Sequence, residues 1–480
     1  MSAGLAAVVC AAGILGLFLL DRDRTSRTSP ALWVPAVWLA IAASRDISQW
    51  FNTVLVTDSP DQLLEGSPVD RVIYAGLLVA GLVVLVSRAE RARSLLRANW
   101  PLVVFFLFCA LSVLWSEYPF VAFKRWTKAL GNLVMVLVVL TERDPPAAVR
   151  QLLTRTGFLL IPFSVLLIKY YPQLGRHFSP WGGMAYNSGV AIGKNGLGIL
   201  CLVLGLGSLW RFLAALPLDE RPRMVRPLIA HGIVLVMALW LFWVADSATS
   251  LGCFLVAALL LGLTSRYGFA RRPMVVLFLV AGIVSVCVLG ILVNTDMGVV
   301  QAMGRDSTLT TRTQLWQDLL RISVDPWFGT GFESFWLGER AKALWRTHWW
   351  HPNQAHNGYL EVFLNLGWIG VILLGFVIAW GFRNVVGALR RDPKLGGLRL
   401  AFFVAAILYN LTEAAFKVMH PVWIAFLLAV TVVPSPDAEG PAPAAQRQRR
   451  TASVAGPPSG RSGSRLEQRR NNHRALTPRH

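Results

Sequence analysis

Three sets of residues in the sequence have the types and spacing to carry chemistry, and the first surrounds an arginine. Thr311-Arg312-Thr313-Gln314 matches the capping-box pattern, so Thr311 is predicted to cap a helix that begins at Arg312. A cation at the first helical position opposes the helix dipole unless an anion sits beside it. A bound phosphate would meet both free backbone N–H groups and the guanidinium fork. The pattern therefore predicts a phosphate site, and the alternative is a solvated surface arginine.

The second set is a group of histidines that leads into an apolar segment. His356 immediately precedes Asn357, a residue type that caps helices. A lone histidine at a membrane surface is usually structural, but imidazole is also the side chain best suited to proton transfer near neutral pH. His356 is therefore a candidate catalytic residue. A zinc site formed by His348, His351 and His356 is the alternative, but their spacing fits no standard zinc pattern, so we expect no metal.

The third set consists of charges inside or against apolar segments. Lys194 lies early in an otherwise apolar segment, and charges at membrane depth usually face a cavity or a partner. Snorkelling to the interface is the alternative, and it suffices for Lys124, Arg125 and Lys417 but less well for Lys194. Other charges at such positions are Lys128, Asp246 and Glu413.

Aromatic residues are concentrated between residues 294 and 357. These 64 residues contain six tryptophans, more than an interfacial belt of membrane anchors needs. Flat aromatic faces also suit the apolar faces of sugar rings, so we expect this segment to bind glycan. Trp349 and Trp350, which lie nearest His356 in the sequence, and Tyr359 are the candidate stacking residues.

The composition indicates what must position these residues. Of the 480 residues, 55% are hydrophobic and 15% are charged, and the mean hydropathy is +0.52. These values exclude a disordered chain and disfavour a soluble multidomain enzyme. Uncharged runs such as 2–20 and 274–293 are long enough to cross a bilayer as helices. The predicted fold class is an all-α, polytopic membrane bundle of about 12–13 spans with one large outer loop.

The predicted spans also explain the net charge of +20. They lie near 2–20, 30–44, 72–87, 100–115, 126–140, 156–169, 189–210, 228–245, 250–264, 274–293, 358–381, 400–413 and 420–434. One alternate set of connections, with the tail, holds 31 of the 46 basic residues but only 11 of the 26 acidic ones. The positive-inside rule makes this set cytoplasmic, which puts the N-terminus outside and the tail inside. The charge therefore reflects topology, and nucleic-acid binding is excluded.

The remaining features are structural. The first span lacks a basic region and a cleavage site, so we expect a retained helix and not a signal peptide. All five cysteines fall within predicted spans, where we expect them to be small apolar packing residues: Cys10, Cys109, Cys201, Cys253 and Cys287.

The tail, residues 435–480, is rich in Pro, Gly, Ser, Gln and Arg and is predicted to be disordered, basic and cytoplasmic. Its charge would lie against anionic membrane lipids.

Several of these motifs, taken in order, resemble the O-antigen ligase superfamily (O-antigen ligases and polymerases, with a Wzy_C-like domain), and most closely its exopolysaccharide-production polymerase branch. The motifs are Gly304-Arg305-Asp306, Thr311-Arg312-Thr313-Gln314-Leu315-Trp316, Pro326-Trp327-Phe328-Gly329-Thr330-Gly331-Phe332, His356-Asn357-Gly358-Tyr359-Leu360-Glu361 and Leu366-Gly367-Trp368-Ile369-Gly370. Ser44-Arg45, Ser48-Gln49-Trp50 and Leu411-Thr412-Glu413 also look like that branch. We expect N-terminal membrane helices over 1–184, the ligase-like domain over 185–380 with periplasmic loop 294–357, and C-terminal helices over 381–434.

The resemblance implies a glycosyltransferase of GT-C-like architecture at the outer face of the bacterial inner membrane. Such enzymes need no metal or other cofactor and move a glycan from undecaprenyl diphosphate to an acceptor hydroxyl. The resemblance assigns diphosphate binding to Arg312 and Lys194, and the fixed cation Arg305 is a further candidate. His356 would lie beside the reacting centre. Thr311 stands where the branch commonly has Gly, and Gly193 stands where a His often precedes the lysine.

Several functions remain open at this point. The acceptor is another glycan repeat unit in a polymerase and lipid A–core in an O-antigen ligase. A transporter of an anion or of a lipid-linked glycan would explain the spans and Lys194, but not the aromatic loop. A scaffold that assembles with polysaccharide-export proteins would not depend on Arg312 or His356.

The topology is directly testable. We predict that residue 320 is periplasmic and that residue 460 is cytoplasmic, because the basic connections alternate with the outer ones. In intact cells, an impermeant thiol reagent should label a cysteine placed near 320 but not one placed near 460. Labelling near 460 would contradict the topology.

Overall fold

The structure is a computed structural model that describes most of the chain. The described residues are 1–22, 28–51, 66–178, 183, 185–216, 224–265, 275, 278–283, 285, 308–322 and 324–434. Arg305, most of the predicted span 274–293 and the predicted tail 435–480 lie outside them.

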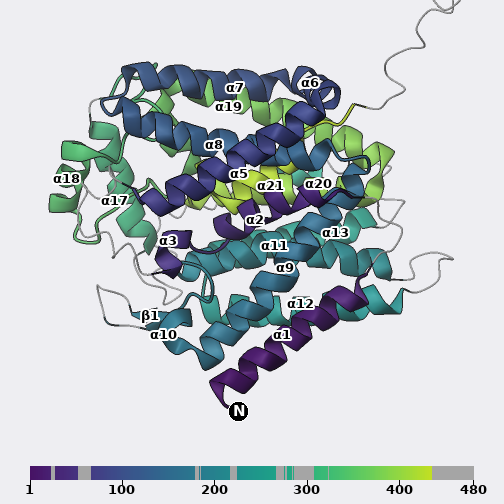
Figure 1. Ribbon diagram of the computed structural model, residues 1–480. Coiled ribbons are helices and arrows are strands. Elements are labelled where there is room, and N and C mark those ends of the chain that lie inside the picture. The colour runs from purple at the N-terminus through teal and green to yellow at the C-terminus, as the bar shows by residue number, and fades with distance from the viewer. Residues whose placement is uncertain are drawn as a thin grey trace, which may run out of the picture. The chain divides into compact units, whose positions relative to one another are not determined.

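The described chain is almost entirely helical, which confirms the predicted all-α class (Figure 1). The helices are α1 (Ala3–Leu20), η1 (Pro30–Leu32), α2 (Trp33–Ala42), α3 (Ile47–Trp50), α5 (Pro68–Ser87), α6 (Ala89–Ala98), α7 (Trp100–Leu111), η2 (Ser112–Trp115), α8 (Pro119–Leu140), α9 (Pro145–Tyr170), α10 (Pro172–Gly175), α11 (Lys194–Ala215), α12 (Val225–Ala245), α13 (Ala248–Ser265), α17 (Thr308–Arg321), α18 (Gly338–Thr347), α19 (Gly358–Arg391), α20 (Pro393–Thr412) and α21 (Pro421–Val430). Two short strands, β1 (Arg176–Phe178) and β2 (Ala185–Asn187), pair antiparallel with Arg176 opposite Asn187.

The chain is a multi-pass membrane protein, and most of the predicted spans lie in helices that are long and apolar enough to cross a membrane. Among the described residues, eight helices are long and apolar enough, and α6 with α7–η2, bent by 89°, makes a ninth candidate. Of the other predicted spans, 30–44 and 420–434 form short apolar helices, and 274–293 is mostly undescribed. Helix α8 carries Lys124, Arg125 and Lys128 in its first half. The two short helices fall below the about 20 residues that cross a bilayer as one helix, and hydropathy alone does not separate such segments from re-entrant ones.

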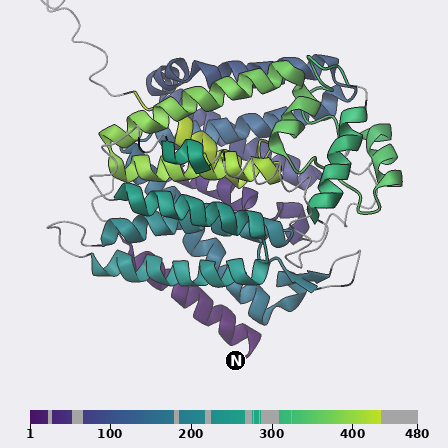
Figure 2. The same cartoon turned by 180° about the vertical axis from the view of Figure 1, so that it is seen from behind.

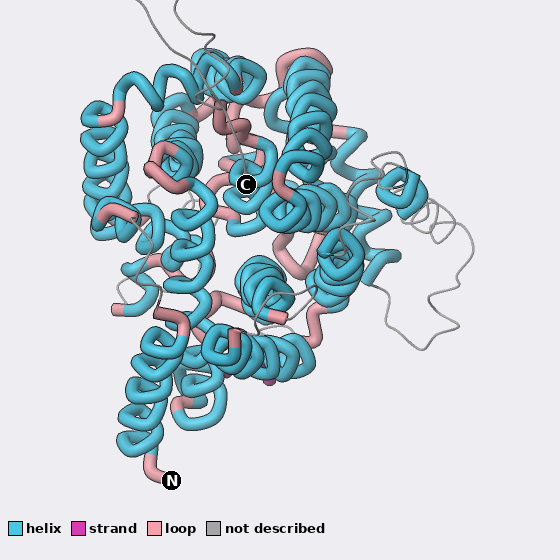
Figure 3. The backbone as a smooth tube through the Cα atoms, turned by 90° about the vertical axis from the view of Figure 1, so that its right-hand side faces the viewer, coloured by secondary structure: helices cyan, strands magenta, loops and turns pink. Residues whose placement is uncertain are grey.

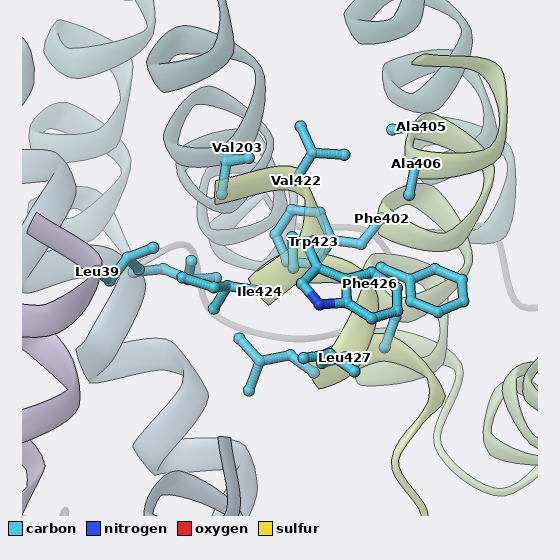
Figure 4. Close-up of a cluster of buried hydrophobic side chains, with 14 of the residues drawn as sticks. Leu39, Val203, Phe402, Ala405, Ala406, Val422, Trp423, Ile424, Phe426 and Leu427 are labelled. Carbon is cyan, nitrogen blue, oxygen red and sulfur yellow. The ribbon is translucent and has the colours of Figure 1, made fainter. Parts of the chain in front are cut away.

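Helix α21 is a short apolar helix that is buried inside the bundle. All ten of its residues are buried, and it packs against α20, α19, α11 and α8. Its aromatic residues Trp423 and Phe426 stack at 5.2 Å between ring centroids, beside Phe402 of α20 and Val203 of α11 (Figure 4). In contrast, α1 and α5 expose most of their apolar side chains at the edge of the bundle. The predicted packing role of the cysteines also fits, since Cys109, Cys201 and Cys253 are buried.

Most long helices run roughly side by side, and several are seen nearly end on in Figure 3. Helices α3, α10, α17 and α18 and strand β1 all lie at one end of the bundle, on the left of Figure 1; we call this the loop end. The hydroxyl of Tyr171, after α9, donates to the carbonyl of Ala3 at 3.1 Å, so α1 begins at this end too. In Figure 2 the same end lies on the right, where α17 and α18 meet α19 and α20.

Helix α19 is broken near the loop end, and the loop after α17 closes the break. Gly367 has φ 62° and ψ −166°, which interrupts the helical hydrogen bonds. The N–H groups of Thr330 and Gly331 donate to the carbonyls of Leu364 and Asn365 at 3.1 and 2.9 Å. In return, Trp368 and Ile369 donate to the carbonyls of Pro326 and Trp327 at 2.8 and 3.2 Å. We call this four-bond contact the clasp.

Glycine is required on both sides of the clasp because the two backbones touch. A Cβ added to Gly367 would lie 2.2 Å from the carbonyl carbon of Trp327. A Cβ on Gly329, whose φ is +67°, would lie 2.5 Å from the carbonyl carbon of Asn365. The glycines of the two motifs therefore have a packing role that does not involve a ligand.

We predict that Gly367→Ala destabilises the protein by more than about 2 kcal/mol, because alanine meets both a left-handed backbone and a steric clash. Gly375→Ala in the same helix is the matched control, since a Cβ there would meet nothing within 4 Å. Thermal unfolding of the purified protein measures both changes. Equal melting temperatures for the two variants would show that the clasp contributes nothing.

Candidate functional site

Arg312 lies in the second turn of its helix, which corrects the sequence prediction. Helix α17 begins at Thr308, so Thr311 is not its N-cap and Arg312 is not its first residue. No glycine or proline between Gly304 and Thr311 stops the helix from extending upstream of the capping-box pattern. The free N–H groups of this helix end are therefore not beside Arg312. Its guanidinium instead extends to the C-terminal end of α20.

A buried carboxylate joins Arg312 to His356. The Nη2 atom of Arg312 donates to Oε1 of Glu413 at 2.8 Å, and its Nη1 donates to the carbonyl of Thr412 at 2.5 Å. The other carboxylate oxygen, Oε2, lies 2.9 Å from Nδ1 of His356. The side chain of Glu413 is 7% exposed, whereas those of Arg312 and His356 are 19% and 18% exposed. We call these three residues the triad.

The end of α20 is built to present Glu413. Helix α20 ends at Thr412, and Glu413 is its C-cap. The side chain of Asn410 turns the chain back, because its Oδ1 accepts from the N–H groups of Ala415 and Phe416 at 2.8 and 3.0 Å. Gly358, the first residue of α19, packs so closely on Asn410 that an added Cβ would lie 1.8 Å from its Oδ1. The starts of α19 and of the segment after α20 are thus fixed to each other.

The contacts within the triad indicate where its protons lie. A carboxylate oxygen only accepts hydrogen bonds, so Nδ1 of His356 carries the proton in this contact. Burial works against ionisation of Glu413, but the hydrogen bond from His356 and the charge of Arg312 outweigh it and hold its pKa below 4.5. The amide Nε2 of Gln354 lies 3.4 Å from Nδ1 of His356, but both atoms are then donors, so they form no hydrogen bond; Oε1 of Gln354 accepts from Lys417 at 2.6 Å.

Lys194 is also at the loop end, and it is the first residue of α11. Its N-cap, Gly193, makes no side-chain cap, and a Cβ added there would meet nothing within 4 Å. The combination predicted for Arg312, a cation beside the N-terminus of a helix, therefore occurs at Lys194. Its Nζ lies 3.6 Å from Oδ2 of Asp246, and both side chains are exposed. The hydroxyls of Thr249 and Thr412 lie 3.3 Å apart and connect this region to the triad.

The candidate glycan-binding residues differ in their surroundings. Trp349 is 65% exposed. Trp350 packs against the core of the α17–α18 region, with its ring 5.8 Å from that of His356. The hydroxyl of Tyr359 donates to the carbonyl of Ile407 at 3.2 Å, and its ring packs on Phe416. Tyr359 is therefore directed into the bundle.

The three loop histidines are not brought together. Nε2 of His348 lies 3.3 Å from Oδ2 of Asp318, and the ring of His351 stacks on that of Trp345 with 4.6 Å between centroids. Of the three, His356 is the one that belongs to the triad. Within the described ranges, no group of three or more His, Cys, Asp or Glu side chains is arranged to hold a metal ion.

From the sequence, Glu413 was only one of several charges beside apolar segments, Lys417 was explained by snorkelling, and Gln354 carried no signal. The motif Leu411-Thr412-Glu413 stood out only as part of the resemblance, and nothing local indicates that Glu413 meets residues 57 and 101 positions away. Only the packing of α17, α19 and α20 at the loop end brings the triad together.

Known proteins are similar in sequence to the part of the chain that contains the candidate site. The O-antigen ligase family model matches residues 232–375, which include Arg312, His356 and the clasp but not Lys194 or Glu413. The exopolysaccharide production protein ExoQ of Rhizobium meliloti (strain 1021) is 25% identical over 338 residues, or 68% of this chain and 74% of ExoQ. Both matches confirm the resemblance to the O-antigen ligase superfamily, and they support a membrane enzyme of polysaccharide assembly.

The depressed pKa of Glu413 predicts an acid-sensitive site. The ionised carboxylate stabilises the folded protein above its ordinary pKa of 4.5, and this contribution is lost as the pH falls through the lowered value. Glu413→Gln should therefore lower the melting temperature at pH 7, and the difference from the natural protein should shrink below pH 4.5. Thermal unfolding between pH 7 and pH 3 measures it. A difference independent of pH would show that Glu413 is not ionised in the folded state.

Proposed function

We propose that the protein is a glycosyltransferase of surface polysaccharide assembly, which transfers a glycan from undecaprenyl diphosphate to a hydroxyl of an acceptor saccharide. The observation that carries the proposal is the triad, in which Glu413 holds a guanidinium and an imidazole side by side at the loop end. The two groups match the two needs of this reaction, a cation for the leaving diphosphate and a group that handles the acceptor proton.

The donor diphosphate binds to cations of the loop end. During transfer the bond between the sugar C1 and the phosphate oxygen breaks, and negative charge develops on that oxygen. Fixed cations stabilise this charge most in the transition state. Arg312 supplies a planar fork, and Lys194 supplies an ammonium beside the uncapped start of α11. Arg305 is a third candidate and lies outside the described residues.

His356 activates or positions the acceptor. Its Nε2 accepts the proton of the acceptor hydroxyl as that oxygen bonds to the sugar C1, and the imidazolium formed is stabilised by Glu413. Glu413 acts through its neighbours, because it fixes the tautomer of His356 and the orientation of Arg312. No metal or other cofactor is part of this scheme.

The glycan chain lies along the aromatic part of the loop. Trp349 is exposed and lies one residue from Trp350, whose ring is near His356, so both are suited to stack on sugar rings. Tyr359 points into the bundle, so we assign it no stacking role. We place the reaction at the periplasmic face of the inner membrane, with the N-terminus periplasmic, the C-terminus cytoplasmic and polysaccharide-export proteins as possible partners of the product.

We predict that Arg312→Ala and His356→Ala each lower the transfer rate about a hundredfold, the effect of losing one transition-state contact of about 3 kcal/mol. Arg312→Lys should restore only part of the loss, because lysine keeps the charge but not the fork. Arg321→Ala is the matched control, since Arg321 lies on the same helix and is 79% exposed. Purified protein, lipid-diphosphate oligosaccharide and acceptor make up the assay.

The same assay separates the competing functions. EDTA should leave the rate unchanged, and inactivation that zinc restores would replace this scheme with a metal mechanism. Near-normal polymer from both alanine variants at normal expression would contradict the assignment of Arg312 and His356. In a deletion strain, short repeat units without polymer would indicate a polymerase, whereas intact polymer left on its lipid carrier would indicate an O-antigen ligase.

A further inference from the structure

Arg45 belongs to a sequence motif that the proposed function does not use. The residue follows α2 and is 7% exposed, although arginine is rarely buried without a carboxylate partner. Its guanidinium lies 5.0 Å from the ring centroid of Trp50, which stacks on Phe163 of α9. Ser48 is fixed next to them, because both its N–H and its hydroxyl donate to the carboxylate of Asp70. The motif thus holds Arg45 in one place.

Within the described residues, the hydrogen bonds of Arg45 go to the segment between α9 and α11, which contains α10, β1 and β2. Its Nε donates to the carbonyl of Ala191 at 3.0 Å. Its Nη2 lies within 3.3 Å of four further acceptors, the carbonyls of Leu174 and Gly189, Oγ of Ser188 and Nε2 of His177. None of these partners, all within the described residues, is a carboxylate. Arg45 is therefore used as a fork of donors and not as half of an ion pair.

The acceptors surround the turn that delivers Lys194. Gly189 and Ala191 lie five and three residues before it, and Ile192 between them and α11 is 59% exposed. On its other side the turn is held by the carbonyl of Gly175, which accepts from Ser188 and Gly189, and by a 3.4 Å contact between Val190 N and Ser164 Oγ. The bond from Arg45 to the carbonyl of Ala191 thus holds the turn three residues before Lys194.

We propose that Arg45 is a positioning residue that fixes the turn 188–193 and thereby the place of Lys194 at the start of α11. This role rests on the proposed function, in which Lys194 binds the donor diphosphate. Arg45 itself does not touch the substrate. A lysine in its place keeps the charge but cannot reach five acceptors at once, so Arg45→Lys isolates the geometry of the fork.

The first experiment does not depend on enzymatic activity. Hydrogen exchange of the full-length protein in nanodiscs should be at least about tenfold faster at residues 188–191 in Arg45→Lys than in the natural protein. Arg88→Lys is the matched control, because Arg88 makes a similar fork to Val138, Thr141, Ser29 and Glu142. It should leave exchange at 188–191 unchanged. Unchanged exchange in Arg45→Lys would overturn the proposal.

The second experiment tests whether Arg45 affects activity through the position of Lys194. Arg45→Lys should lower kcat/KM about tenfold through a higher KM for the lipid-diphosphate donor, with the acceptor KM unchanged. In a Lys194→Ala background, the same change should cost less than about twofold, whereas any loss from Arg88→Lys should persist in full. Faster exchange without loss of activity, or an equal loss in both backgrounds, would overturn the positioning role. If the natural protein transfers no glycan, the proposed function fails, and the exchange experiment alone decides whether Arg45 fixes the turn.

Discussion

The site depends on the cost of burying one carboxylate. Glu413 is 7% exposed and ionised, and a buried charge of this kind is tolerated only when both oxygens have good partners. Arg312 and His356 supply them from two other segments, so the electrostatics of Glu413 define the distance and orientation between these two groups. Removing either partner of such a buried pair costs about 3–5 kcal/mol, which makes the arrangement nearly all-or-none. The same contacts therefore stabilise the site and fix the positions of Arg312 and His356.

The same rule governs the backbone of α19 at Gly367. A break in a helix that spans a membrane leaves carbonyl and N–H groups without intrahelical partners, and lipid offers none. The segment from Pro326 to Gly331 satisfies two groups of each kind, and it can approach because neither Gly329 nor Gly367 has a side chain. The loop that carries the candidate chemistry is thereby attached to the bundle through backbone atoms. The triad holds the chain at His356, just before α19 begins, and the clasp holds the helix at its break.

The sequence was informative wherever the signal was local. Apolar runs predicted the helical class, and residue type and local motif singled out Lys194, Arg312 and His356, which all lie at the loop end. It misplaced the start of α17 by four residues, because a capping pattern cannot show whether upstream residues also become helical. Its hydropathy marked residues 420–434 as a span, whereas the helix there, α21, has ten residues and is buried in the bundle. It could not find the role of Glu413, since that role comes from pairing across 57 and 101 residues.

The clasp also imposes an order on biosynthesis. Thr330 lies 34 residues before Leu364, so the ribosome releases the loop before the helix whose carbonyls it must satisfy. If α19 entered the bilayer first, its break would expose unpaired backbone groups to hydrocarbon, at a cost of several kcal/mol for each group. The segment from Pro326 to Gly331 therefore has to be in place before α19 is stable in the bilayer, so the loop acts as a folding partner of a helix made after it.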